Sequence, residues 1–210
     1  SKSLAAFLGK KTEELNLITI HLGNGCSMTA VKAGKSVDTT MGLSPLPGLM
    51  MGTRCGDIDP AVLFFLHENL KMPVSQIDEL LNKQSGLKGI AGDNDMRTIE
   101  KKVAEGDPAA KLALAMYCYR IKKYIGAYLA VLGKTDALVF TAGVGQNSST
   151  VRAMACAGLE NMGIILDETK NRLKAVGIFE ISHHDSPIKV FVVPTNEELE
   201  IAEQTYRLLA

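Results

Sequence analysis

Ala137-Leu-Val-Phe-Thr-Ala-Gly-Val-Gly-Gln-Asn147 is a short apolar run that leads directly into two closely spaced glycines. The run 137–141 is predicted to be a buried strand, and a helix is predicted to follow from Ser148. A glycine turn between a strand and a helix is typical of phosphate binding, because free N–H groups and the helix dipole face the ligand. The dinucleotide fingerprint is incomplete, since its third glycine would fall at Ser148, so the segment indicates a nucleotide more readily than NAD.

Upstream of this segment, alternating β-branched residues predict a strand at 16–21. Turn signals at Gly23-Asn24-Gly25 and at Gly34-Lys35 indicate that the chain then reverses twice in antiparallel hairpins. The returning strands are expected at 27–32 and 35–39, and a last buried strand is expected at 189–193.

Helices are predicted where apolar residues recur at three- and four-residue steps. The clearest is 108–132. Further helices are expected at 59–69 and 75–83, from Met96, from Ser148 and from Asn196, the last with Leu199, Ala202, Tyr206 and Leu209 on its inner face. The glycine-bearing stretches 41–60 and 86–95 are predicted to be loops, and long loops are often functional. Hairpins followed by helix–strand–helix units predict an α/β fold, with a mixed sheet flanked by helices.

The composition favours a globular domain or one lobe of a larger enzyme: 210 residues, 46% hydrophobic and 22% charged. Twenty-three basic and 23 acidic side chains cancel, so no broad positive field is available for nucleic acid or a membrane surface, and neither partner is expected. No signal peptide or membrane-spanning run is recognisable, and four scattered cysteines lack C-x-x-C spacing, so a cytoplasmic location is expected. The start at Ser1, within an amphipathic turn, suggests a fragment.

Two glycine-rich segments are candidates for binding an anion. The tip from His21 to Gly25 would let backbone N–H groups approach a phosphate, with an ordinary hairpin turn as the alternative. Arg54 lies between glycines on the long loop, where its planar fork could bind a phosphate or carboxylate. The alternative is that Arg54 pairs with Asp57 or Asp59. Cys26 is interpreted as a packing residue rather than a nucleophile.

Two acidic segments complete the set of candidates. Asp93-Asn94-Asp95-Met96-Arg97 could line a ribose or base, or it could simply be a turn in which Asp95 caps the helix that begins at Met96. Near the end of the chain, Thr195 and Glu198 fit a capping box. Glu197 is not needed for that box, so it is a candidate Mg²⁺ ligand.

In combination these segments resemble acetate kinase and its close relatives, the propionate and butyrate kinases. The resemblance runs in order across essentially the whole chain through five motifs: HLGNG at 21–25, VDTTMGLSPLPGLMMGTRCGDIDP at 37–60, DMR at 95–97, FTAGVGQN at 140–147 and PTNEE at 194–198. Each motif alone is weak, whereas the ordered set is specific.

The resemblance implies a ribonuclease H-like lobe of the acetate and sugar kinase, Hsp70 and actin superfamily. It implies that residues 1–210 are the C-terminal, nucleotide-binding lobe, that the N-terminal lobe is absent, and that the whole protein is a homodimer that phosphorylates acetate with ATP. By the same resemblance, Arg54 stabilises the transferring phosphoryl group and Glu197 serves Mg²⁺. The implied ATP contacts are His21, Leu22, Gly23, Asn24, Gly25, Asp95, Met96, Arg97, Gly143, Val144, Gly145, Gln146 and Asn147.

Two features separate this chain from the family pattern. The family usually has Glu where Gln146 stands, and the N-terminal lobe would supply a phosphate loop, a catalytic Asp and a substrate-binding Arg. The isolated chain is therefore expected to bind ADP or ATP weakly and to lack kinase activity.

Two other functions are weighed: a nucleotide-binding module without chemistry, which would not need Arg54 and Glu197, and a NAD-dependent oxidoreductase, which rests on Gly143 and Gly145 alone. The length of the acyl chain is not predicted, because one methylene changes binding by only about 1–3 kcal/mol.

Overall fold

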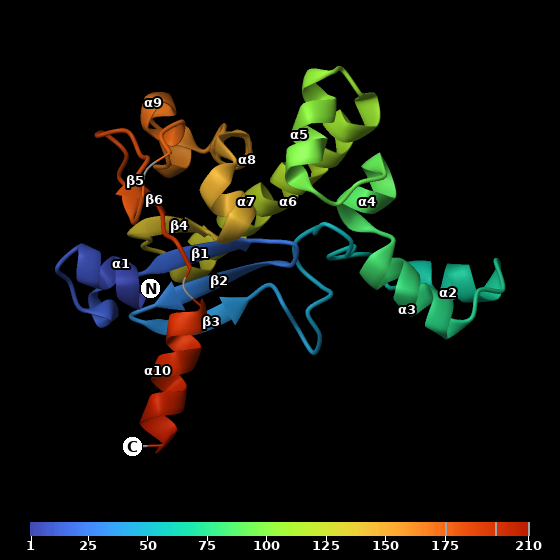
Figure 1. Ribbon diagram of the computed structural model, residues 1–210, viewed down its shortest axis with the longest axis horizontal. Helices are drawn as coiled ribbons and strands as arrows, with labels where there is room; N and C mark the ends of the chain where they lie inside the picture. Colours follow the sequence, from blue (N-terminus) through green and yellow to red (C-terminus); the bar gives the residue numbers. More distant parts are fainter. Residues whose placement is uncertain (175, 196, 210) are drawn as a thin grey trace.

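The computed structural model describes residues 1–174, 176–195 and 197–209, without the side chains of 197–200, 203 and 209. Its centre is a six-stranded sheet in the order β3-β2-β1-β4-β6-β5 (Figure 1). The strands are β1 (Leu17–Leu22), β2 (Cys26–Lys32), β3 (Lys35–Thr39), β4 (Ala137–Thr141), β5 (Phe179–Glu180) and β6 (Lys189–Val192). β1, β4 and β6 run parallel, whereas β2, β3 and β5 pair antiparallel with their neighbours. The predicted mixed sheet is confirmed.

Helices cover the sheet and extend beyond one end of it (Figure 1). They are α1 (Lys2–Phe7), α2 (Ala61–Glu68), α3 (Val74–Lys83), α4 (Gly86–Ala91), α5 (Met96–Ala104), α6 (Pro108–Leu132), α7 (Ala142–Asn147), α8 (Ser149–Cys156), α9 (Glu168–Asn171) and α10 (Glu197–Leu209). Two 3₁₀ turns, η1 (Thr12–Glu14) and η2 (Glu160–Met162), complete the described elements. In the part of the chain that is described, no helix is both long and apolar enough to span a bilayer.

The core has two parts because successive residues of a strand point to opposite faces of the sheet. Leu138 and Phe140 of β4 belong to the larger cluster, which includes the buried stripe of α6. Ala137 and Val139 of the same strand belong to a smaller cluster with residues of α1. The sheet is therefore a central layer, and its parallel strands are buried by helices in the manner expected for α/β proteins.

Three predictions about local structure are wrong. The turn expected at 142–147 is helix α7, and the loop expected at 86–95 contains α4. The last helix does not bury its apolar residues: Ala202 is exposed and Tyr206 is 74% exposed, because α10 projects away from the sheet (Figure 1). Periodicity identified the apolar stripe but could not say whether another element covers it. Leu199 and Leu209, named with it, lie outside the described side chains.

Candidate functional site

A pocket of about 660 Å³ opens where the parallel strands β1 and β4 end. Three segments far apart in the sequence line it: the hairpin tip after β1, the start of α5, and α7 after β4. Ligands of α/β proteins bind preferentially at the carboxyl ends of parallel strands. The lining residues are Gly23, Asn24, Asn94, Asp95, Met96, Arg97, Glu100, Gly143, Val144, Asn147 and Ser148.

The hairpin tip is closed by its own backbone and tied to the neighbouring loops. The Gly23 N–H donates to the Gly25 carbonyl at 3.0 Å, and the Asn24 carbonyl accepts from Gly52 N–H at 3.3 Å. Asn94 Nδ2 donates to Asn24 Oδ1 at 3.3 Å. A Cβ at Gly52 would lie 2.7 Å from that Oδ1 atom, so only glycine lets this loop pack against the tip.

The start of α5 places opposite charges on the pocket wall. Asp95 caps the helix, because its Oδ1 accepts from Arg97 N–H at 2.9 Å, as the capping alternative predicts. The Arg97 guanidinium also pairs with Asp95 Oδ2 at 2.6 Å. The hydrogen bonds from the Arg97 side chain, followed by its backbone N–H, hold the pKa of Asp95 below its usual range. Capping and pocket lining are thus compatible roles for the same carboxylate.

Helix α7 follows β4 without an intervening loop. The chain turns at Ala142, whose φ of +64° is unusual for a residue with a side chain. A Cβ at Gly143 would meet no atom within 4 Å, whereas one at Gly145 would lie 3.5 Å from the Phe140 backbone. Gly143 is therefore open toward the pocket, and Gly145 allows α7 to pack closely on the sheet.

The carboxyl end of α7 is held by Arg152, a residue that belongs to none of the predicted site segments. Its Nη1 donates to the carbonyls of Gly145 (2.9 Å) and Gln146 (2.8 Å), and its Nε donates to Asn171 Oδ1 at 2.7 Å. Arg152 is 2% exposed, and burial lowers its pKa to about 10. These bonds satisfy helix-terminal carbonyls that have no partner within the helix and fix the segment that lines the pocket.

Arg54 lies beside the hairpin tip rather than on the pocket wall. Its Nη1 donates to the Pro45 carbonyl at 3.3 Å, and a Cβ at Gly25 would approach that nitrogen to 3.1 Å. No carboxylate of the described residues pairs with it. The predicted alternative of an ion pair with Asp57 or Asp59 is wrong.

Each of those carboxylates has another partner. Asp57 pairs with Arg120 at 3.3 Å and accepts from Tyr124 at 2.6 Å. Asp59 accepts from the Ala61 N–H at 2.9 Å and so supports the start of α2. Arg54 is left with neutral partners, which suits a guanidinium that is to meet an anionic group from outside this chain.

Five of the ATP contacts implied by resemblance do not line the pocket. Leu22 is 0% exposed and belongs to the core, so it could contribute only its backbone to a ligand. Gly25 lies under Arg54 and Gly145 against the sheet. Gln146 offers its carbonyl to Arg152, and half-buried His21 is paired in register with Thr141. The Glu197 side chain lies outside those described.

Two pocket residues were not predicted as site residues, Glu100 and Ser148, whereas Asn94 belongs to the segment 93–97 that was predicted as a candidate. Glu100 follows Met96 by four residues, so helical spacing could have placed both on one face. Ser148 Oγ accepts from Val151 N–H at 3.0 Å, which caps α8, and donates to Glu100 Oε1 at 2.5 Å. That contact joins α5 to the α7–α8 junction, and both residues line the pocket.

Two buried side chains near the site matter for its chemistry. Thr141 Oγ1, at the end of β4, has no hydrogen-bond partner among the described residues. An unpaired buried hydroxyl costs free energy, so a group that enters beside it can gain a hydrogen bond.

Cys26 is fully buried, with Sγ 3.1 Å from the Tyr117 hydroxyl, and burial raises its pKa to about 11. Its thiol is therefore protonated at neutral pH, as expected of a packing residue.

Comparison with known protein families identifies the family to which this chain belongs. Residues 1–203 match the model described as the acetokinase family. The chain belongs to this family. The predicted resemblance is confirmed, and so is the fold class of a mixed sheet flanked by helices.

Individual acetokinase relatives agree along the whole chain. The acetate kinase of Lawsonia intracellularis is 58% identical over 210 residues, which are 100% of this chain and 52% of that protein. The structure of Porphyromonas gingivalis acetate kinase superposes with a TM-score of 0.94 at 45% identity, covering 99% of this chain and 52% of its own. A propionate kinase from Francisella tularensis gives 0.90 at 44% identity, covering 96% and 51%. The chain spans about half the length of the relatives it matches.

Proposed function

We propose that this chain is the C-terminal, nucleotide-binding half of an acetate kinase, which transfers a phosphoryl group between ATP and acetate. The observation that carries the proposal is the single pocket formed by three of the family-like segments, although the first and last lie more than 100 positions apart. A pocket of this volume is within the range used for small-molecule ligands. Belonging to the acetokinase family supports the same conclusion.

In the proposed reaction a carboxylate oxygen of acetate attacks the γ-phosphorus of ATP. The bond from phosphorus to the β–γ bridging oxygen breaks, and ADP leaves with that electron pair. The transition state spreads negative charge over the equatorial oxygens, so its stabilisation requires positioned cations more than covalent catalysis. Arg54 has neutral partners beside the tip and is proposed to supply a guanidinium there. The pocket residues of α5 and α7 are proposed to hold the nucleotide.

Mg²⁺ would neutralise phosphate charge in this reaction. The residues present fit a hard cation: the pocket wall carries oxygen ligands from Asp95, Glu100 and Asn24. Mg²⁺ in such sites is usually held by one or two carboxylates, water and the substrate phosphates. Glu197, at the start of α10 just after β6, is proposed as a further ligand, directly or through water.

A two-lobe chimera tests the proposal. It joins the N-terminal half of the Lawsonia intracellularis relative to Ser1 of this chain. We expect the chimera to form acetyl phosphate, detected as the hydroxamate, and the 210-residue chain alone to bind MgADP weakly without turnover. Turnover by the isolated chain would contradict the assignment of a half enzyme. No nucleotide binding by either protein would contradict the assignment of the pocket.

The remaining alternatives differ in what the chimera would do. A non-catalytic nucleotide module predicts binding without turnover, and substitution of Arg54 or Glu197 would then leave the affinity for the nucleotide unchanged. A propionate or butyrate kinase predicts a higher kcat/KM for the longer acid. A NAD-dependent enzyme predicts that NADH fluorescence changes on titration, which we do not expect.

The whole protein is further proposed to be a cytoplasmic homodimer. Helix α2 exposes Phe64 and Phe65, which are 64% and 56% accessible, and contiguous exposed apolar residues often mark a protein contact. Light scattering of the chimera is expected to give twice the mass of one chain. A monomer at micromolar concentration would contradict the dimer without affecting the nucleotide pocket.

A further inference from the structure

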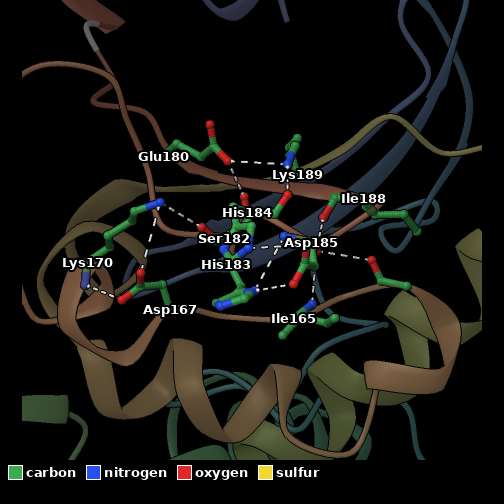
Figure 2. A network of polar contacts seen from close by, with 12 residues as sticks. Ile165, Asp167, Lys170, Glu180, Ser182, His183, His184, Asp185, Ile188 and Lys189 are labelled. Atoms are coloured by element: carbon green, nitrogen blue, oxygen red, sulfur yellow. Dashed lines mark hydrogen bonds and ion pairs between the residues drawn. The ribbon is translucent and has the colours of Figure 1, made fainter.

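A second group of side chains that could bind a metal lies near the amino ends of the parallel strands, at the other end of the sheet from the pocket. His183, His184 and Asp185 occupy the connection between β5 and β6, just before the amino end of β6. Their candidate ligand atoms all lie within 4.8 Å of one another. Figure 2 shows the three side chains gathered together, with Asp167 and Lys170 on one side and Glu180 and Lys189 above.

Two distances within the group are close to the separation of ligands in a metal site. His183 Nδ1 lies 3.6 Å from one oxygen of Asp185, and His184 Nε2 lies 3.2 Å from the other. Two ligands bound to Zn²⁺ at about 2.0–2.1 Å in tetrahedral geometry are separated by roughly 3.3 Å. The two contacts of Asp185 are already near this separation, and rotation of the exposed side chains would bring all three ligand atoms, which lie within 4.8 Å of one another, to one ion.

The backbone beneath the group is already fixed. His183 N–H donates to the Ile165 carbonyl at 2.8 Å, and Ser186 N–H returns to the His183 carbonyl at 3.0 Å, which closes the turn. Ser186 is 2% exposed, and its Oγ accepts from Ile165 N–H at 3.0 Å and donates to the Ile188 carbonyl at 2.6 Å. A preformed turn lowers the entropy that must be lost when an ion binds.

The hydrogen bond within the group competes only weakly with a metal ion. Asp185 N–H donates to His183 Nδ1 at 3.4 Å, and a hydrogen bond of this length is a weak competitor for the Nδ1 lone pair. Imidazole nitrogens are common metal ligands in proteins.

The surrounding charges do not oppose a cation. Lys170 Nζ donates to the Ser182 carbonyl at 3.1 Å and lies 4.0 Å from Asp167. Lys189 Nζ donates to the His184 carbonyl at 3.1 Å and lies 3.8 Å from Glu180. Each ammonium group thus has its own carboxylate, so the Asp185 charge is left for the ion.

We infer that His183, His184 and Asp185 bind a divalent transition-metal ion such as Zn²⁺, with water completing its coordination. Two imidazoles and a carboxylate are a ligand set suited to Zn²⁺ and its neighbours rather than to Mg²⁺. The ligand side chains are 38%, 77% and 70% exposed, which leaves room for water and an entry path. The site ties the β5–β6 connection together and does not depend on the nucleotide pocket.

Titration of the 210-residue chain with Zn²⁺, in competition with a chromophoric chelator and without nucleotide, tests the inference. We expect one ion per chain at this site. His183→Asn, His184→Asn and Asp185→Asn should each weaken affinity at least about tenfold, since even loss of an outer-shell group costs 10–100-fold. Matched controls are His67→Asn and Cys55→Ser, which remove the exposed imidazole and the half-buried thiol elsewhere and should leave affinity unchanged.

Two outcomes would overturn the inference: Zn²⁺ binding that survives all three ligand variants, or binding that is lost in either control. A measurement on the unaltered chain guards against variants that fail to fold. The chain has four histidines, and Zn²⁺ should shift the ring-proton resonances of the two in this turn. Shifts confined to His21 and His67, or no shifts, would contradict the site directly.

Discussion

The hairpin tip 23–25 and helix α7 each contain a G-x-G sequence whose first glycine lines the same pocket, yet they are built differently. The tip is a turn held by peripheral contacts from Gly52 and Asn94, each about 3.3 Å long. Helix α7 is pinned from behind by the buried Arg152 through bonds of 2.8–2.9 Å. The links from the tip to its neighbouring loops are therefore longer hydrogen bonds than those that hold α7.

This difference separates two tasks. A fixed wall can set the position of a bound nucleotide, since preorganised groups cost little to arrange when the ligand arrives. A tip with weaker contacts can respond to a phosphate chain and to Arg54 beside it. Substitutions in the two regions should therefore affect different quantities: catalysis at the tip and stability at α7.

The largest expected effect is on catalysis beside the tip. Arg54→Gln in the two-lobe chimera should lower kcat by at least about a thousandfold, because a guanidinium that stabilises the transferring phosphoryl group contributes 10³–10⁵ in rate. The affinity for MgADP should change by less than about threefold. Steady-state kinetics and calorimetry measure the two quantities. A parallel loss of both would show that Arg54 holds ground-state nucleotide instead.

The next largest effect is on stability behind α7. Arg152→Leu should lower the free energy of unfolding by about 3 kcal/mol, because several buried carbonyls lose their donor at once. Arg172→Leu is the matched control: its pair with Glu168 is exposed, so its loss should cost about 0–1 kcal/mol. Urea denaturation of the two variants compares them. Equal costs would mean that α7 does not depend on Arg152.

The pH dependence of the free energy of unfolding compares two buried thiols, one next to the tip and one at the end of the helix that follows α7. Cys26 lies behind the tip and Cys156 ends α8, and burial raises their pKa values to about 11 and 12. A pKa raised in the folded state gives stability that is fully present below pH 9 and is lost as the pH rises through these values. Between pH 9 and the raised pKa, each buried thiol should lower the free energy of unfolding by about 1.4 kcal/mol for each pH unit.

Urea denaturation at pH 8, 9 and 10 would measure this loss. Cys26→Ala should make the free energy of unfolding fall less steeply with pH, by the contribution of one buried thiol. Cys55→Ala should have a smaller effect on this pH dependence, because Cys55 is only half-buried, although burial raises its pKa as well. Identical slopes in the two variants would show that the tip leaves Cys26 open to solvent.

The smallest effects come from glycine substitutions. Gly143→Ala has free space and a helical backbone, so it should raise the free energy of unfolding by about 0.5–1 kcal/mol while its methyl group weakens MgADP binding. Gly52→Ala must displace Asn24 and Asn94 and should destabilise the chain. Unchanged MgADP affinity in Gly143→Ala would indicate that the nucleotide does not approach α7.

The sequence predicted this fold well where strands are short, apolar and bounded by glycines. The strand 137–141 and the helix 108–132 have the predicted bounds. The helix at 142–147 was missed because two glycines in six residues lower helix propensity; its tertiary support from Arg152 is invisible to local patterns. Likewise, periodicity on α10 could not reveal that the helix leaves the body of the fold.

The site was predicted as separate segments, and their meeting at one pocket required the sheet order. Glu100 and Ser148 were missed because neither belongs to a recognisable motif; they are joined only in three dimensions. The contacts of Arg54 were equally hidden, since Asp57 and Asp59 stand closer in sequence than Pro45, whose carbonyl accepts from the Arg54 side chain. Local sequence identified polar and glycine-rich segments, but not their partners.

Hydrogen–deuterium exchange of the 210-residue chain with and without MgADP tests the central claim most directly, because it locates the bound nucleotide. We predict that protection appears together at the tip 22–26, at 94–100 and at 142–148, and that the turn 183–189 is unaffected. Protection confined to any other part of the chain, or none at saturating MgADP, would contradict a nucleotide site between the tip, α5 and α7.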